Sequence, residues 1–463
     1  MNAVQSEYNM GAMQDGRRLW YVEQAVVSST GTPFSRFSCG NFTSLADVNS
    51  TTVRNWFNAE YDPRGMHLVV FSHEPMQVLQ RRVEARFSGI KFSESWKGPV
   101  RAEVTAVIIP NSVLQSWVYV EPIKDIRTLR MMWFIPPRFA VNGNRAAEVA
   151  ASVLGGSGPG SILSNLKDEG LASSFSASAE NDALDAAFFY INAELTVEGL
   201  ANITRVIQLI FQGIGSLGKQ TLPAWIVEEH NQMSSLNYMW QTRKTNYRDI
   251  AAAVYTLRHE DLAGYPRKSL FWEYAPFDLL DIFLNHLTPN KSIIFVQGRA
   301  SDTFNVTFDS SEPIAGTRYS MVNISDADMN TFIKAHESLQ QKNYYPPPSP
   351  YMPNPPPEIL YQIDPFIASN LQKWEPNPEP ITLDFNTNPA FRNTYLAPDM
   401  EFGTPKMVLK TSFFSPAFDF AGDPRKEIIG YLWMSQVLET TEQWSSQAAA
   451  GGFQYFPKKV TFS

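Results

Sequence analysis

The stretch LGGSGPGSILSNLKDEGLASSFSAS, residues 154–178, carries the signals that decide the fold. A glycine-rich turn leads into a short helix, which is expected to stop at Gly170 because glycine is favoured just beyond a helix C-terminus. A strand at 172–180 follows, and the apolar run AAFFYINAEL predicts a second strand at 186–195. Adjacent strands with a helix beside them favour helices packed on an antiparallel-rich sheet.

The sequence on both sides of this stretch mixes strands and helices in the same way. Apolar patterns predict further strands at 104–110, 116–122, 127–137 and 292–298, and helices at 144–155, 197–217, 223–243 and 275–288. We therefore expect an α+β fold of two-layer domains, in which helices cover antiparallel-rich sheets.

The chain of 463 residues is too long for one ordinary domain. The block before the predicted sheet contains an N-terminal helix at 1–28 and three later elements, namely a helix within 44–61, a strand at 66–72 and a helix at 74–90. Eight prolines lie within YYPPPSPYMPNPPPEILY, residues 344–361, and predict an extended linker. The last block contains predicted strands at 381–388 and 400–416 and a helix at 424–447.

These features predict an incomplete first domain at 1–95, a complete second domain at 100–343, a linker at 344–380 and an incomplete third domain at 381–463. Two strands and one helix are too few to bury a full core. We therefore expect the flanking blocks to be parts of longer domains, and the chain to be an internal piece of a longer protein.

Composition and charge exclude several classes of protein. The net charge of −8 and the lack of a basic stripe argue against nucleic acid as a partner. One cysteine, Cys39, permits no disulfide framework. The sequence has no apolar run of membrane-spanning length and no visible signal peptide, so a soluble, cytoplasmic protein is the default expectation.

No complete catalytic motif is present in the sequence. The six histidines include no H-E-x-x-H or H-x-x-E-H pair, and VEEH at 227–230 lacks the second histidine. The segment GGSGPGS at 155–161 lacks the Lys-Ser/Thr of a phosphate-binding loop. Glu7 is the one unusual carboxylate, since it shares a mostly apolar or small helix face with Ala3, Val4, Tyr8 and Gly11. The simplest interpretation of Glu7 is a solvated side chain.

Several segments together resemble the insulinase/pitrilysin family of zinc metallopeptidases, the inverted zincins. In chain order they are AVQSEYN (3–9), PFSRFSCGN (33–41), PIKDIRTLRMMWFIPP (122–137), the stretch 154–178, IAGTRYS (314–320), PPPSPYMP (346–353), LKTSFFSP (409–416) and WSSQAAAGGFQY (444–455). Each match alone is weak, but their order along nearly the whole chain makes the resemblance specific. It implies domains of the insulinase and mitochondrial-processing-peptidase type.

The resemblance also implies a function and its residues. In that family H-x-x-E-H supplies two zinc ligands and a general base, and a later glutamate is the third ligand. Glu7 matches that third ligand, so zinc is the expected cofactor of the complete protein and is not expected to bind this chain tightly alone. The family's substrate-anchoring site, where a peptide adds a strand to a sheet edge, matches Gly155, Gly156, Ser174, Phe175, Ser176 and Ala177. The family often has glycines in that strand, where this chain has Ser176, Ala177 and Ser178.

Two interpretations of function follow from the resemblance. In the first, the chain is a piece of a zinc metalloendopeptidase that cleaves peptides with a zinc-activated water, and is inactive alone because it lacks H-x-x-E-H. In the second, it is a non-catalytic subunit that binds peptides or pairs with a catalytic chain. The expected partners are peptide substrates and the remaining parts of the same protein.

Overall fold

The computed structural model describes residues 1–27, 36–92, 96, 98, 112–135, 146–183, 186–239, 247–257, 271–272, 277–301, 304–338, 345, 348–350, 352, 381–383, 394–396 and 424–450. The chain folds into two compact units. The first comprises Met1–Val227, Val254–Lys268 and Trp272–Pro348, and the second Glu228–Ala253, Ser269–Phe271 and Ser349–Ser463. The first unit contains every candidate site residue named above.

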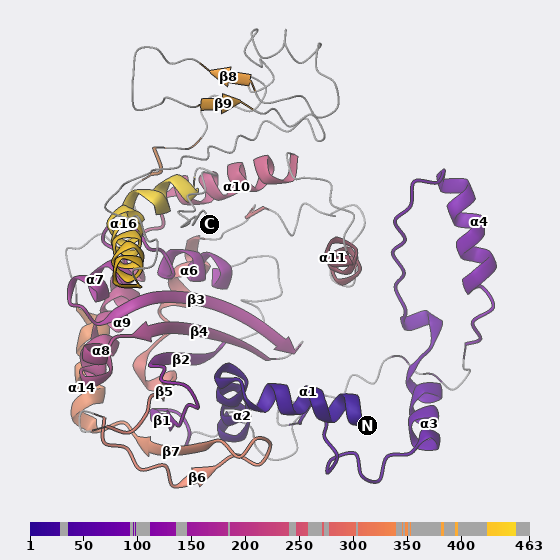
Figure 1. Ribbon diagram of the computed structural model, residues 1–463, viewed down its shortest axis with the longest axis horizontal. Helices are drawn as coiled ribbons and strands as arrows, with labels where there is room; N and C mark the ends of the chain where they lie inside the picture. Colours follow the sequence, from indigo (N-terminus) through magenta and orange to yellow (C-terminus); the bar gives the residue numbers. More distant parts are fainter. Residues whose placement is uncertain are drawn as a thin grey trace. The chain divides into compact units, whose positions relative to one another are not determined.

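A seven-stranded sheet in the order β3-β4-β2-β5-β1-β7-β6 organises the first unit (Figure 1). Its strands are β1 (Ser116–Val120), β2 (Thr128–Ile135), β3 (Ala172–Ala183), β4 (Ala186–Leu195), β5 (Ser292–Gln297), β6 (Ser310–Ser311) and β7 (Arg318–Asn323). The β1–β5 pair is parallel and the other five pairs are antiparallel. The predicted α+β fold with an antiparallel-rich sheet is confirmed.

Helices cover one face of this sheet and bury the larger core. They are α6 (Ala146–Leu154), α7 (Ile162–Asp168), α8 (Val197–Ala201), α9 (Ile203–Leu217), α13 (Phe277–Leu284) and α14 (Asp326–Glu337). Alternate residues of β2, Leu129, Met131 and Trp133, face these helices and are fully buried. Met132 points to the opposite face, where it joins a smaller core with Val22 of α2. This alternation follows from the two-residue period of a strand.

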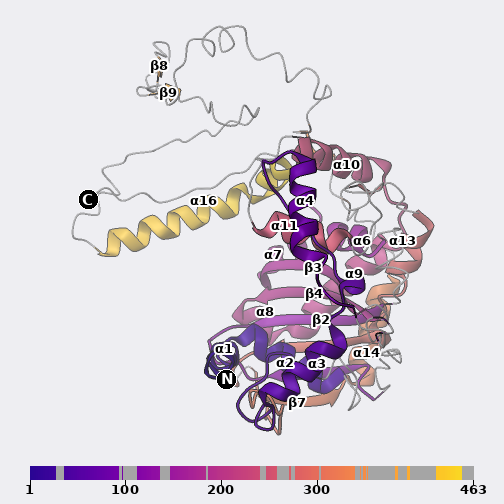
Figure 2. The same cartoon turned by 90° about the vertical axis from the view of Figure 1, so that its right-hand side faces the viewer.

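The opposite face of the sheet carries a broken helix in place of the single helix predicted at 1–28. Helices α1 (Asn2–Ala12) and α2 (Asp15–Val27) are separated at residues 13–14 (Figures 1 and 2). The carboxylate of Asp15 accepts hydrogen bonds from Ile123 N and Lys124 N at 2.6 and 3.0 Å. Arg18 Nη1 donates to Ala12 O at 3.5 Å, beside the end of α1. These interactions favour a turn where the sequence pattern would permit a continuous helix.

Side-chain caps fix the starts of several helices. Ser161 Oγ accepts from Ser164 N at the start of α7, and Ser325 Oγ accepts from Asp328 N at the start of α14. A capping bond of this kind contributes about 1 kcal/mol to helix stability. Gly170, just after α7, has φ +69°, a left-handed conformation that glycine adopts without strain. The predicted helix stop at Gly170 is confirmed.

The strand predicted at 66–72 is wrong. Residues 66–71 have no strand partner in the described part of the chain, and Met66, Leu68 and Val70 are exposed. A strand requires a neighbour to pair its N–H and C=O groups, which an alternating apolar pattern does not supply. The strands predicted at 104–110 and 400–416 lie outside the described residues. Strand β7 and helices α11 and α14 were not among the predicted elements.

The remaining elements complete the described chain. They are α3 (Ser50–Glu60), η2 (Pro63–Gly65), α4 (Met76–Phe87), α10 (Ala224–Met239), α11 (Tyr247–Leu257), η3 (Pro289–Lys291), β8 (Ile381–Leu383), β9 (Thr394–Leu396) and α16 (Pro424–Ala450). None of the described helices is both long enough and apolar enough to cross a membrane.

Candidate functional site

Helix α1 presents Glu7 to solvent beside its packed face. Val4, Tyr8 and Gly11, at helical spacings of four and three, are buried or half-buried, whereas Glu7 is exposed. The Glu7 carboxylate makes no hydrogen bond or ion pair with another described residue. It is therefore available to a ligand, but nothing within the described chain holds its carboxylate in one direction.

The ring of Tyr8 links α1 to two other segments. Its hydroxyl donates to Ile314 O at 2.6 Å. Its ring packs edge-on against Phe37 with a centroid separation of 5.6 Å, and Phe37 packs in the same way against Tyr21 of α2 at 6.0 Å. Tyr21 is 1% exposed, so the aromatic chain anchors α1 to the buried part of α2.

A buried carboxylate organises the loop that receives the Tyr8 hydroxyl. Glu312 is 1% exposed, and its oxygens accept from Ile314 N at 2.6 Å, Ala315 N at 2.9 Å and Thr317 N at 2.9 Å. Thr317 Oγ1 also donates to it at 2.7 Å. Gly316 turns the chain with φ +67°. Because four donors converge on one carboxylate, the conformation of this loop is tightly specified.

Helix α2 is fixed to the sheet by an ion pair. Arg130 Nη1 of β2 lies 2.7 Å from Glu23 Oε1, and the Glu23 side chain is fully buried. Arg130 Nε also donates to Asn192 Oδ1 at 2.7 Å, and its guanidinium lies 5.2 Å from the centroid of the Tyr190 ring. Removing one partner of a buried pair leaves an uncompensated charge, so this ion pair specifies where α2 packs.

The described residues do not form a zinc site by themselves. They contain no group of three or more His, Cys, Asp or Glu side chains arranged to hold a metal. A protein zinc site needs about three protein ligands, and Glu7 supplies one. The donor set described here therefore does not fit zinc.

Strand β3 forms one edge of the sheet (Figure 1). Its one strand neighbour in the described part of the chain is β4. Leu195 N donates to Arg127 O at 2.8 Å, between the strand ends of β4 and β2. Along an antiparallel strand, the backbone N–H and C=O groups of successive residues point to opposite sides. The N–H group of Leu195 points towards β2, so the backbone groups of Glu194 and Asn192 point towards β3.

The same alternation decides which residues of β3 direct their backbone N–H and C=O groups towards β4 and which direct them away from the sheet. Ser174 and Ser176 are the register partners of Glu194 and Asn192, so their backbone groups pair with β4. The N–H and C=O groups of Phe175, Ala177 and Ala179 point away from the sheet, at its edge. Three of the predicted substrate-anchoring residues therefore play different parts: Ala177 offers a backbone edge, and Ser174 and Ser176 offer exposed side chains.

The turn after α6 runs close to this edge. A Cβ added to Gly155 would lie 2.9 Å from Ala151 O and 3.1 Å from Ala177 N. Glycine is therefore required for the backbone to approach β3 this closely. The structure brings Gly155 and Ala177 together as one local site, whereas a Cβ on Gly156 would meet Val153 O at a less crowded 3.4 Å.

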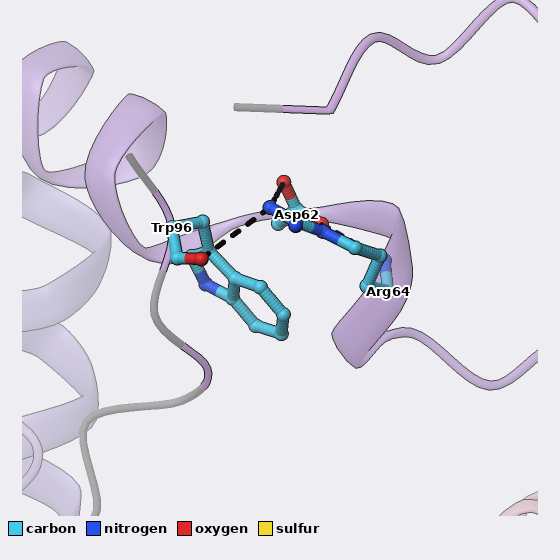
Figure 3. Close-up of polar contacts among 3 residues, drawn as sticks. All are labelled: Asp62, Arg64 and Trp96. Atoms are coloured by element: carbon cyan, nitrogen blue, oxygen red, sulfur yellow. Dashed lines mark hydrogen bonds and ion pairs between the residues drawn. The ribbon is translucent and has the colours of Figure 1, made fainter. Parts of the chain in front are cut away.

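A separate polar cluster holds together the segment after α3. Asp62 accepts two bonds from the Arg64 guanidinium, at 2.7 and 3.0 Å, and the Asp62 side chain is fully buried (Figure 3). Hydrogen bonding to Asp62 raises the pKa of Arg64 above its ordinary value. The guanidinium also lies 4.9 Å from the Trp96 ring centroid, and its Nη2 donates to Trp96 O at 3.5 Å. This cluster closes a chain segment and touches no candidate site residue among those described.

Sequence reasoning missed the residues that position the site. Asp15, Glu23 and Glu312 are buried carboxylates. The partners of Asp15 and Glu23 lie more than one hundred residues away. Those of Glu312 lie in its own loop, where the spacing to Thr317 was the available signal.

Comparison with known proteins gives a consistent result. A family model described as "Peptidase M16 inactive domain" matches residues 47–234, and one described as "Middle or third domain of peptidase_M16" matches residues 239–459. Human insulin-degrading enzyme is 26% identical over 468 residues, which cover 98% of this chain and 43% of that protein. The insulin-degrading enzyme-like 1 protein of Arabidopsis thaliana is 23% identical over 468 residues, which cover 98% of this chain and 45% of that protein.

A solved structure shares the fold along nearly the whole chain. The crystal structure of pitrilysin superposes with a TM-score of 0.72 and 18% identity, covering 97% of this chain and 46% of that chain. This chain therefore spans less than half the length of each of these three proteins.

Proposed function

Because this chain belongs to the insulinase/pitrilysin family of peptidases, peptidase M16, we propose that it anchors peptide substrates within a zinc metalloendopeptidase. In this proposal residues 100–343 are the substrate-anchoring domain, and residues 1–95 belong to the domain that binds zinc. Residues 344–380 link it to 381–463, part of the third domain. Hydrolysis then requires an H-x-x-E-H motif, which this sequence does not contain.

One observation carries the peptide-binding part of the proposal. Strand β3 is an edge strand whose outward N–H and C=O groups at Phe175, Ala177 and Ala179 can pair with an extended peptide. Pairing through the backbone does not depend on glycines, so the serines at 174, 176 and 178 are compatible with it. The exposed Ser174 and Ser176 leave room for substrate side chains on one face.

Glu7 has a different part in the proposal. We assign it as one zinc ligand, because it is the exposed carboxylate on a helix otherwise docked through its small and apolar face. The chain alone should then retain no zinc after dialysis, as measured by metal analysis of the purified protein. One tightly bound zinc ion per chain would contradict this assignment.

Peptide binding can be tested on the chain as it stands. We expect fluorescein-labelled unstructured peptides to bind weakly, with an anisotropy change at high micromolar to millimolar protein. Ala179→Pro removes an outward N–H and should abolish binding, because proline has no donor. Ala179→Thr keeps the N–H and is the matched control. Absence of binding by the unaltered chain, or equal binding by both variants, would overturn the anchoring proposal.

The zinc assignment needs a fusion in which a catalytically active relative supplies the H-x-x-E-H segment and the remaining domains. In that fusion Glu7→Gln should lower both zinc affinity and peptide hydrolysis, because a neutral amide is a poorer zinc ligand than a carboxylate. Gln14→Glu, at an exposed residue between α1 and α2, should change neither. Full activity of Glu7→Gln would restore the interpretation of Glu7 as a solvated carboxylate. Peptide binding without any role for Glu7 would favour the non-catalytic subunit.

A further inference from the structure

The side chains beside the β3 edge differ between the two faces of the sheet. On one face they are apolar, since Phe175 of β3 and Ile191 of β4 pack with the helices in the larger core. The opposite face packs on α2 further into the sheet, and we call it the α2 face. Near the edge the α2 face is polar and exposed, because Ser174 and Ser176 point to it.

Glu194 of β4 lies in a row of side chains that ends at this edge. Its register partners are Ser174 on β3 and Thr128 on β2, and alternation along β4 places it on the same face as Tyr190 of the smaller core. Glu194 is exposed, and its carboxylate makes no hydrogen bond or ion pair with another described residue. Glu180 of β3 is exposed too, but it already interacts with another residue.

Two cations flank this row, and both are already paired. Arg127, which precedes Thr128 in the chain, lies 3.1 Å from the Asp125 carboxylate. Arg130, two residues after Thr128, lies 2.7 Å from the buried carboxylate of Glu23. Since each guanidinium has its own carboxylate, the negative charge at the edge end of the row is not offset by either of them.

A β-bulge ends the regular pairing of β3 at the same row. Ala172 pairs with Leu195 and Ser174 with Glu194, so Ser173 is an extra residue on β3. A bulge bends its strand and interrupts the alternation of backbone groups along the edge. The row of Ser174 is therefore the last one at this end where a peptide strand added to β3 can pair regularly.

The spacing of strands defines which peptide side chains can reach Glu194. An added strand would lie one strand spacing beyond β3, so its backbone would be about 10 Å from that of β4. Within the row, only the small side chain of Ser174 lies between them. A lysine or arginine side chain extended across Ser174 can meet the Glu194 carboxylate, whereas a shorter side chain cannot span this distance.

We propose that Glu194 is a specificity-determining residue of the β3 edge, which favours peptide segments that carry a lysine or arginine side chain on the α2 face. This inference rests on the proposed function, because it presupposes that a peptide pairs with β3. It adds the class of substrate, namely basic peptides. Because the contact is exposed to solvent, its effect on affinity is modest, about 2- to 5-fold.

The test uses peptides of about seven residues with both termini blocked, so that only side chains carry charge. One peptide has a lysine near its N-terminus and another near its C-terminus, because either direction of the added strand is compatible with pairing. Matched peptides have norleucine in place of lysine, which keeps the aliphatic chain and lacks the charge. Fluorescence anisotropy with the full chain at about 0.01 M salt, where screening is weak, gives the dissociation constants.

We expect at least one lysine peptide to bind about 2- to 5-fold more tightly than its norleucine match, and the difference to disappear at about 1 M salt. Glu194→Gln should abolish this preference. Glu194→Lys should reverse it, so that a peptide with glutamate in place of lysine binds more tightly than the lysine peptide.

Glu198→Gln is the matched control and should keep the preference. It removes the same charge from an exposed residue of α8, on the helix-covered face, and its side-chain oxygen can still accept the hydrogen bond from Asn202. Loss of the preference in this control would overturn the proposal, since the effect would then come from the net charge of the chain.

Two further results would overturn the proposal, namely equal affinities for lysine and norleucine peptides, and a preference that survives Glu194→Gln. Neither result affects the anchoring role, because the norleucine peptides report on backbone pairing by themselves. If no peptide binds the unaltered chain, the proposed function fails and this inference fails with it.

Discussion

Gly155 occupies a position where a single methyl group would meet two backbone atoms, Ala151 O and Ala177 N. We expect Gly155→Ala to lower the free energy of unfolding by about 1–3 kcal/mol, the usual range for overpacking. Gly156→Ala is the matched control, because its Cβ would meet only Val153 O and Ser152 O, at 3.4 and 3.9 Å. Urea denaturation of both variants measures the difference, and a Gly155→Ala variant as stable as the control would mean that the turn relaxes freely.

A second residue makes the stability of the fold depend on pH. Burial lowers the pKa of His336, Lys219 lowers it further, and Glu337 partly opposes them. Its Nε2 is buried without a hydrogen-bond partner among the described residues. In the unfolded chain the side chain takes up a proton near pH 6.5, whereas in the folded chain it does so only at lower pH.

We therefore expect the folded state to lose stability as the pH falls below about 6.5, and to gain nothing from this group above that pH. The measurement is the urea midpoint between pH 7.5 and 5.5. His336→Leu should be less sensitive to pH over this interval than the unaltered chain, because the titrating group is removed. Identical pH dependence in the two proteins would assign the effect to other groups.

At the scale of elements, the crossing of α9 and α14 depends on Gly215. A Cβ at this position would lie 1.8 Å from His336 O, which is a backbone atom and cannot move without displacing α14. Gly215→Ala should destabilise the chain by about 2 kcal/mol or more. Gly16→Ala in α2, where nothing lies within 4 Å, should instead stabilise it by about 0.5–1 kcal/mol through helix propensity. Thermal unfolding measures the change in melting temperature of each variant. Changes of the same sign in Gly215→Ala and Gly16→Ala would contradict this packing argument.

The sequence predicted those elements whose apolar pattern is strong and local. Strands β1 to β5 and helices α6 and α9 follow from such patterns, and the glycine stop after α7 follows from backbone chemistry. The pattern at 66–72 is just as apolar, yet the described residues offer it no partner strand. Strand β7 was missed because its exposed Met321 and Val322 and its buried Ser320 do not follow the usual alternation.

The candidate site was predictable in part for a similar reason. Gly155 and Ala177 were identified through a resemblance in a continuous stretch, and the structure places them side by side. The roles of Asp15 and Glu23 depend on partners more than one hundred residues away, at Ile123 and Arg130. No local pattern distinguishes such a buried carboxylate from a solvated one.

At the scale of the whole molecule, limited proteolysis should cut first within the segment predicted as a linker. The division at Pro348 and Ser349 falls inside the proline-rich segment predicted as a linker, 344–380. Trypsin can cut there after Lys373, and we expect this cut before any within 120–300, where the sheet and its helices bury most of the core. Mass spectrometry of the first fragments provides the measurement, and early cuts within 120–300 would contradict the proposed domain division.

The hydrogen bond between Tyr8 and Ile314 also bears on how the chain is made. The two residues are 306 positions apart. At the usual rate of protein synthesis, about 5–20 residues per second, Tyr8 is added to the chain roughly 15–60 s before Ile314. During that interval the first helix has no carbonyl to receive its hydroxyl, and its apolar residues remain open to chaperones and to other nascent chains. The packing of Tyr8 on Phe37 can form early, but the hydrogen bond between α1 and the β6–β7 loop is thus a late event in folding, set by the arrival of that distant loop.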